Sequence, residues 1–218
     1  MNSHSNSKQY LCPLCNSLAI HFYNHIKSVF YRCGGCDAIF VPVPFLLNRK
    51  DEELRYLGHN NNINDPGHRK FIQPLIDAVV SNFSKSALGL DFGAGYSPIA
   101  SAMLAEMGYS TDLYDPFFHP NTQVFDKKYD YILSSEVIEH FYYPKMEFSR
   151  LREMLHTGGK LFCQTHLYSD DIVFRSWYYK NDPTHVFIYT PQTLQWIQEN
   201  LGFSDLSISG RIIVFSKH

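Results

Sequence analysis

The sequence lacks a long hydrophobic run, and its opening lacks the apolar core of a signal peptide. No apolar stretch in the 218 residues approaches the roughly 20 that a membrane-spanning helix needs. The first ten residues, MNSHSNSKQY, are mostly polar. We therefore expect a cytoplasmic protein that does not insert into a membrane.

A large charge of either sign is also missing. Charged residues make up 18% of the chain and the net charge is −2, so the overall charge does not favour binding to the phosphates of nucleic acids. The charge is uneven, because residues 1–50 contain five basic residues and one acidic residue. A small basic surface of this kind is usually just solvated, but it leaves a contact with RNA open.

The common glycine-rich phosphate-binding signatures are absent as well. DFGAGYS at residues 91–97 is not followed by Gly-Lys-Ser/Thr, which excludes a P-loop, and it lacks the third glycine of a dinucleotide fingerprint. It does follow an apolar run, 87–92, that predicts a buried parallel strand. Residues 99–107 then have the apolar spacing of a helix. Gly93 and Gly95 allow a tight turn between the two, which predicts a doubly wound α/β domain.

Two aspartates frame this turn. Asp91 lies near the end of the first predicted strand, and Asp115 follows the next one, 110–114, about twenty residues after the turn. A carboxylate at that position binds ribose hydroxyls in doubly wound nucleotide-binding sheets. One aspartate at a strand end would mean little, but two at this spacing predict a nucleoside-binding site.

Four segments together resemble the class I S-adenosylmethionine (SAM) dependent methyltransferases. They are DFGAG at 91–95, YDP at 114–116, YDYILSSEVIEHF at 129–141 and LHTGGKLF at 155–162, in the order of that family's motifs. The resemblance covers residues 55–218. It implies a Rossmann-like sheet of seven strands, six parallel and one antiparallel. Residues 116–128 are too few for a full third strand and helix, so we expect both to be shortened, with 123–125 as the remnant of the strand.

The remaining elements are predicted from apolar periodicity. Helices are expected at 67–83, 144–156 and 191–201, strands at 129–134 and 160–166, and a hairpin at 204–216 around Gly210. Gly158 and Gly159 are expected to end the second of these helices. Residues 50–57 are charged and compatible with a helix.

Four of the five cysteines form two C-x-x-C pairs. Cys12, Cys15, Cys33 and Cys36 have the spacing of a zinc ribbon, in which each pair supplies two thiolates to a tetrahedral structural Zn2+. A redox dithiol and an iron–sulfur site are weaker alternatives. Cys163 is expected to be a buried core thiol. We predict three parts: a zinc-ribbon-like module at 1–45, a linker or lid at 46–66, and a SAM-dependent methyltransferase domain at 67–218.

The resemblance also implies site residues. The cofactor-binding residues it implies are Asp91, Gly93, Gly95, Asp115, Phe117 and Glu136; plain packing of Phe117 is about as good an explanation of that residue. Three histidines, His185, His140 and His166, map to the strand ends of one face and are candidate general bases, His185 first. The segment 59–67, with His59 and Asn61, suits either a linker or a lid over the site.

A catalytic metal is an alternative at the same place. Small-RNA 3′-terminal 2′-O-methyltransferases hold a divalent metal with a similar E-x-x-E-H and a later histidine, which here would be Glu136, Glu139, His140 and His185. The same E-V-I-E-H also occurs in members without a metal, including quinone-biosynthesis methyltransferases. At the level of sequence we favour the metal-free site.

We predict an enzyme that transfers the methyl group of SAM to an O, N or C atom of an acceptor, most simply a small metabolite. Two alternatives stay open. One is an RNA methyltransferase that uses the zinc ribbon for recognition. The other is a catalytically inactive module that binds SAM or a partner. The sequence predicts neither the acceptor nor the oligomeric state.

Overall fold

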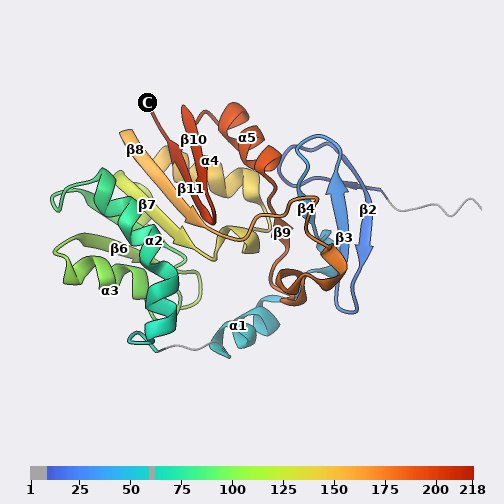
Figure 1. Cartoon of the computed structure of the whole chain (residues 1–218), viewed down its shortest axis with the longest axis horizontal. Coiled ribbons are helices and arrows are strands. Elements are labelled where there is room, and N and C mark those ends of the chain that lie inside the picture. Colours follow the sequence, from blue (N-terminus) through green and yellow to red (C-terminus); the bar gives the residue numbers. More distant parts are fainter. Residues whose placement is uncertain (1–8, 59–61) are drawn as a thin grey trace, which may run out of the picture.

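A computed structural model describes residues 9–58 and 62–218, and it contains two sheets (Figure 1). The larger sheet has the strand order β10-β11-β8-β7-β5-β6. Its strands are β5 (Leu88–Phe92), β6 (Ser110–Tyr114), β7 (Tyr129–Ser135), β8 (Leu155–Gln164), β10 (Asp205–Ser209) and β11 (Ile212–Ser216). Neighbouring strands from β6 to β8 are parallel, whereas β11 is antiparallel to both β8 and β10. The predicted α/β class with a reversed strand near the end is confirmed.

The predicted number of seven strands is wrong. Within the described residues the sheet has six strands, five in one direction and one reversed. Residues Thr122–Asp126, which contain the expected remnant of the third strand, form a short 3-10 helix. Its Val124 is buried in the core, so this segment covers the edge of the sheet beside β6 without pairing with it.

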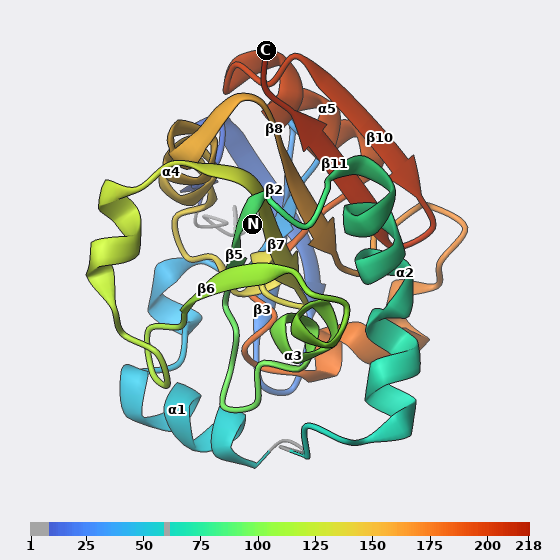
Figure 2. The same ribbon diagram turned by 90° about the vertical axis from the view of Figure 1, so that its left-hand side faces the viewer.

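Helices cover both faces of this sheet, with α2 and α4 on opposite sides (Figure 2). The helices α2 (Pro66–Asn82) and α3 (Ile99–Glu106) pack on one face, against Tyr131 and Phe162. The helices α4 (Pro144–Met154) and α5 (Pro191–Asn200) pack on the other, which includes Ile132 and Leu161. Because side chains alternate along a strand, each buried strand contributes side chains to the hydrophobic clusters on both faces of the sheet. The described helices include none that is long and apolar enough to cross a membrane.

The expected glycine turn at the end of α4 does not form. The helix ends at Met154, and Leu155 already has extended backbone angles as the first residue of β8. The amide of Gly158 donates to the carbonyl of Lys217 (2.7 Å), and the amide of Lys217 donates to Gly159 (3.0 Å). These glycines therefore continue the strand beside the end of the chain.

The smaller sheet joins the N-terminal part of the chain to the part that contains the large sheet. Its order is β1-β2-β3-β4-β9, formed by β1 (Tyr10–Leu11), β2 (Leu18–Asn24), β3 (Val29–Cys33), β4 (Ile39–Phe40) and β9 (Phe187–Ile188). In β9, Phe187 pairs with Phe40 and Ile188 with Ile39. One hydrophobic cluster contains Cys12 and Cys36 together with Phe215 of the large sheet. The two sheets thus share a core, while the module boundary at residue 45 stays a prediction.

Between the two sheets, helix α1 (Arg49–Leu57) lies at the lower edge of the molecule in Figure 1. Asn48 caps it by accepting hydrogen bonds from the amides of Lys50 and Asp51. No side chain of this helix is buried. The position of α1 is therefore set by contacts of a few partly exposed side chains, such as those of Arg49 and Tyr56 with Phe117.

Candidate active site

A cavity of about 640 Å³ opens at the carboxyl ends of β5, β6 and β7. This is where open parallel sheets bind their ligands. All six predicted cofactor residues line it, as do His140 and His185, but His166 does not. The lining also includes residues that sequence reasoning missed, among them Arg49, Glu52, Tyr56, Tyr142 and Arg150.

The turn after β5 exposes its backbone to this cavity. Gly93 has φ +83° and Gly95 has φ +66°, a left-handed conformation that glycine adopts at little cost. A Cβ on Gly93 would lie 2.4 Å from a methyl group of Val137, whereas a Cβ on Gly95 would meet no atom within 4 Å. Gly93 is therefore required by packing. Gly95 keeps open a space in the cavity wall that a bound group can approach closely.

Asp115 closes this turn from the neighbouring strand. One carboxylate oxygen accepts from the amide of Gly95 (3.0 Å), and the other accepts from the amides of Phe117 and Phe118 (2.8 and 3.0 Å). Asp91 is buried beneath the turn and accepts from the hydroxyl of Ser101 (2.8 Å). Burial raises the pKa of Asp91 to about 6. Two carboxylates thus border the space in front of Gly95.

Helix α1 covers one end of the cavity. The guanidinium carbon of Arg49 lies 5.0 Å from the ring centroid of Phe117, and Tyr56 packs edge-on against the same ring at 5.5 Å. Arg49 also donates to the carbonyl of Pro116 (3.1 Å). Phe117 is therefore held against α1 while still lining the cavity. The sequence of α1 shows only a charged helix, and its role as a cover is decided by these tertiary contacts.

The two lining histidines face each other. Their ring centroids lie 5.0 Å apart. Nδ1 of His140 is 2.8 Å from the carbonyl of Thr184, and Nδ1 of His185 is 2.7 Å from that of Tyr179. Because a carbonyl only accepts, each Nδ1 carries the hydrogen, which leaves Nε2 to accept a proton in the neutral ring. Burial, together with His140, lowers the pKa of His185 to about 4, so its imidazole is neutral at neutral pH.

His166 does not line the cavity with this pair. Its ring packs against Trp177 and Tyr179, with centroid distances of 5.1 and 5.6 Å. Its Nδ1 is 3.3 Å from both the hydroxyl of Tyr178 and the guanidinium of Arg211. The structure therefore does not bring His166 into the cavity with the other two histidines.

Two glutamates follow β7 in the chain and differ in their contacts. Glu136 has φ +52° and lines the cavity. Its Oε1 is buried without a hydrogen-bond partner in the described structure, 3.8 Å from the guanidinium of Arg211. Burial, reinforced by Glu139, raises the pKa of Glu136 to about 8. Glu139 is fully buried and accepts hydrogen bonds from the hydroxyls of Thr165 (3.0 Å) and Tyr179.

These features fit SAM. The open wall at Gly95 admits a close approach, and the neighbouring carboxylates suit the hydroxyls of a ribose. The unsatisfied oxygen of Glu136 suits a hydrogen-bond donor, such as the ammonium group of the methionine part. Phe117 and Phe118 supply apolar surface beside Asp115. Of the predicted lid residues, His59 and Asn61 lie outside the described residues.

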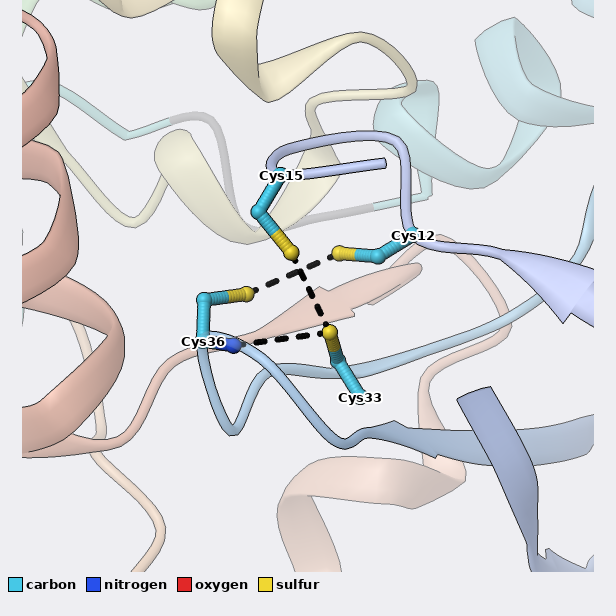
Figure 3. Close-up of side chains that lie close together, drawn as sticks. All are labelled: Cys12, Cys15, Cys33 and Cys36. Atoms are coloured by element: carbon cyan, nitrogen blue, oxygen red, sulfur yellow. Dashed lines mark hydrogen bonds between the residues drawn. The ribbon is translucent and has the colours of Figure 1, made fainter. Parts of the chain in front are cut away.

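The four paired cysteines converge in the N-terminal sheet (Figure 3). The sulfur atoms of Cys12 and Cys36 are 3.6 Å apart, and those of Cys15 and Cys33 are 3.2 Å apart. The edges of a tetrahedron of thiolates around zinc measure about 3.8 Å, given Zn–S bonds of about 2.3 Å. The amides of Gly35 and Cys36 point at the sulfur of Cys33. The predicted cluster is confirmed, and its geometry fits a structural Zn2+.

Among known protein families, the sequence model of one described as a methyltransferase domain matches residues 67–208 of this chain. None of the curated proteins matches this sequence.

Solved structures share the fold at low sequence identity. A magnesium protoporphyrin IX methyltransferase from Synechocystis PCC 6803, with S-adenosylhomocysteine (SAH) bound, is 14% identical, with a TM-score of 0.54 over 78% of this chain and 94% of that one. A 1,6-didemethyltoxoflavin-N1-methyltransferase from Burkholderia thailandensis, with its substrate and SAH, is 13% identical, with a TM-score of 0.57 over 90% and 98%. Human N-acetylserotonin methyltransferase is 16% identical, with a TM-score of 0.52 over 69% and 53%.

Proposed function

Because the chain belongs to the methyltransferase domain family, we propose that it transfers the methyl group of SAM to an O, N or C atom of a small-molecule acceptor. The family predicted from four sequence motifs is thereby confirmed. The observation that carries the proposal is a single cavity that joins the Gly93–Gly95 turn and Asp115 to His140 and His185.

When bound, SAM supplies an electrophilic methyl group on a sulfonium and leaves as SAH. Asp115 and the glycine turn would hold the nucleoside part, and Glu136 the methionine part. The residues of the chain then contribute positioning, which keeps acceptor and methyl group in line. His140 and His185 have ring nitrogens at the cavity wall, the place of a general base for an acceptor that must lose a proton. His185 is the weaker candidate for this role, because burial lowers its pKa to about 4.

A small acceptor is supported by the size and cover of the site. A volume of about 640 Å³ is in the range of small-molecule pockets, and α1 covers one end. The three similar structures named above are described as enzymes acting on a porphyrin, a toxoflavin precursor and N-acetylserotonin. RNA is the weaker candidate, because Arg32 of the basic N-terminal part is ion-paired with Asp37 and Asp170. None of the five cysteines forms a disulfide, which suits a cytoplasmic enzyme.

The test is methyl transfer from labelled SAM in a cell extract that is then separated into metabolite, protein and RNA fractions. We expect label in the metabolite fraction, and none above background with Asp115→Ala. Label in the RNA fraction would replace the small molecule by RNA. Retained SAH binding with no label in any fraction would support the inactive binding module.

A further inference from the structure

The side chains of Glu139, His140 and His185 meet at the cavity wall. One carboxylate oxygen and one nitrogen of each ring lie within 4.8 Å of one another. From this arrangement we infer that the three residues bind a divalent transition-metal ion, separate from the zinc of the cysteine cluster. Its role at the site rests on the proposed methyl transfer, but its existence does not.

The hydrogen bonds of the two histidines orient them as metal ligands. Each Nδ1 donates to a backbone carbonyl, of Thr184 or Tyr179, so Nε2 of each neutral ring is the nitrogen with a free lone pair. A backbone carbonyl or carboxylate on the second nitrogen is the usual outer contact of a metal-bound histidine. A cation bound by these two lone pairs and the nearby carboxylate oxygen would satisfy all three groups at once.

Glu139 adds the negative charge. Its side chain is fully buried, and within the described part of the chain its two oxygens accept hydrogen bonds from the neutral hydroxyls of Thr165 and Tyr179 alone. Among residues 9–58 and 62–218, no Lys or Arg forms an ion pair with it. Burying a carboxylate without a counter-charge is costly. Those hydroxyls fix the carboxylate beside the histidines, as outer contacts do at metal sites.

The donor set selects the kind of ion. Two imidazole nitrogens and one carboxylate oxygen suit Mn2+, Fe2+, Co2+ or Zn2+, whereas Mg2+ and Ca2+ prefer oxygen alone. Ligand bonds of about 2.1 Å place the donors of a tetrahedral site about 3.4 Å apart, so the three side chains must move together by roughly 1 Å to close on an ion. Glu136, the fourth residue suggested by the sequence, lies outside this group.

The metal site also limits which chemical group of the acceptor is methylated. Because His140 and His185 line the cavity, an ion held by three protein ligands has its open positions within reach of it. An acceptor that offers a hydroxyl oxygen fills such a position, and a bound divalent metal makes a hydroxyl more acidic. In this form the histidines are ligands and not bases. The acidified hydroxyl loses its proton to solvent water, its oxygen takes the methyl group of SAM, and SAH leaves.

The test uses the full chain with its zinc in place, titrated with Mn2+ and followed by the electron paramagnetic resonance signal of free Mn2+. We expect one Mn2+ per chain, not displaced by excess Mg2+. Glu139→Gln and His140→Gln should each weaken binding at least tenfold, the second being a partly exposed position that the fold tolerates. The matched control is His156→Gln, an exposed histidine outside the cluster, which should bind Mn2+ as the native chain does.

Absence of Mn2+ binding, or binding that both cluster variants retain, would overturn the metal site. SAH titration of the same samples separates the two proposals. SAH binding without Mn2+ binding rejects only the metal site, and Mn2+ binding without SAH binding rejects only the proposed function.

Discussion

Gly93 and Gly95 have the same left-handed backbone but different surroundings, and this difference makes the turn testable residue by residue. Gly95→Ala should cost about 1–2 kcal/mol of folding free energy, the cost of a left-handed alanine, because nothing lies near its new methyl group. Gly93→Ala adds an overlap with Val137, so its cost should be roughly 2–5 kcal/mol.

Urea denaturation measures both costs, and SAH titration shows their effect on the site. We expect Gly95→Ala to fold and to bind SAH at least tenfold more weakly, since its methyl group occupies the wall of the cavity. Equal destabilisation by the two changes, or unchanged SAH affinity in Gly95→Ala, would contradict the division of roles between the two glycines.

Burial of Asp91 predicts that the unfolding free energy depends on pH. Burial raises the pKa of its carboxyl to about 6, above the ordinary value of 3.8. The folded state therefore binds this proton more tightly than the unfolded state. The stabilisation of the folded state that results is fully present below about pH 4 and is lost as the pH rises through 6. At 1.36 kcal/mol per unit, the loss is roughly 2–3 kcal/mol. Asp91→Asn should gain stability relative to the native chain by that amount between pH 4 and pH 8.

The measurement is the unfolding free energy of the native chain and Asp91→Asn at several pH values. If the difference in unfolding free energy between the two proteins did not change with pH, burial would not raise the pKa of Asp91.

At the scale of elements, β9 connects the zinc ribbon to the active site. The amide of Val186 donates to the carbonyl of Glu139 (2.9 Å), and its carbonyl accepts from the amide of Val41 (2.8 Å). The segment beside His185 is thus hydrogen-bonded on one side to the end of the ribbon and on the other to the cluster. The ribbon acts here as a support for the site, whatever else it binds.

Loss of zinc should therefore destabilise the large sheet as well as the zinc ribbon. Cys12→Ser and Cys36→Ser should remove one Zn per chain and lower the melting temperature, because the cysteines share a hydrophobic cluster with the large sheet. Cys163→Ala is the matched control, because Cys163 is a buried thiol outside the group of four paired cysteines, and this variant should keep one Zn per chain. Metal analysis and thermal unfolding decide this, and a zinc-free variant with native stability would contradict it.

Elements with a clear periodicity were predictable, and those defined by distant partners were not. The strands β5 and β6, the helix α2 and the C-terminal hairpin lie where their apolar spacing placed them. By contrast, β9 has two residues and exists only through its pairing with β4. The glycines after α4 looked like a helix end because their partner, the end of the chain at Lys217, is far away in sequence.

Across the whole molecule, the sequence predicted the strand-end residues of the site, since one topological rule places them at the same edge of the sheet. The cover formed by α1 and the hydroxyls that hold Glu139 were not predictable, because both depend on contacts between segments that are far apart in the sequence. The two sheets share a core, and the division of the chain into a ribbon, a linker or lid and a methyltransferase domain stays a prediction. This shared core predicts one cooperative unfolding transition.

The most direct test of the central claim is calorimetric titration of SAH into the native chain, Asp115→Ala and Asp112→Asn. Asp112 is the matched control, since it lies on β6 three residues before Asp115, accepts from Lys127 and Tyr129, and does not line the cavity. We expect binding in the micromolar range, about −8 kcal/mol, lost in Asp115→Ala and kept in Asp112→Asn. No binding by the native chain, or equal binding by all three, would contradict the assignment of this cavity to SAM.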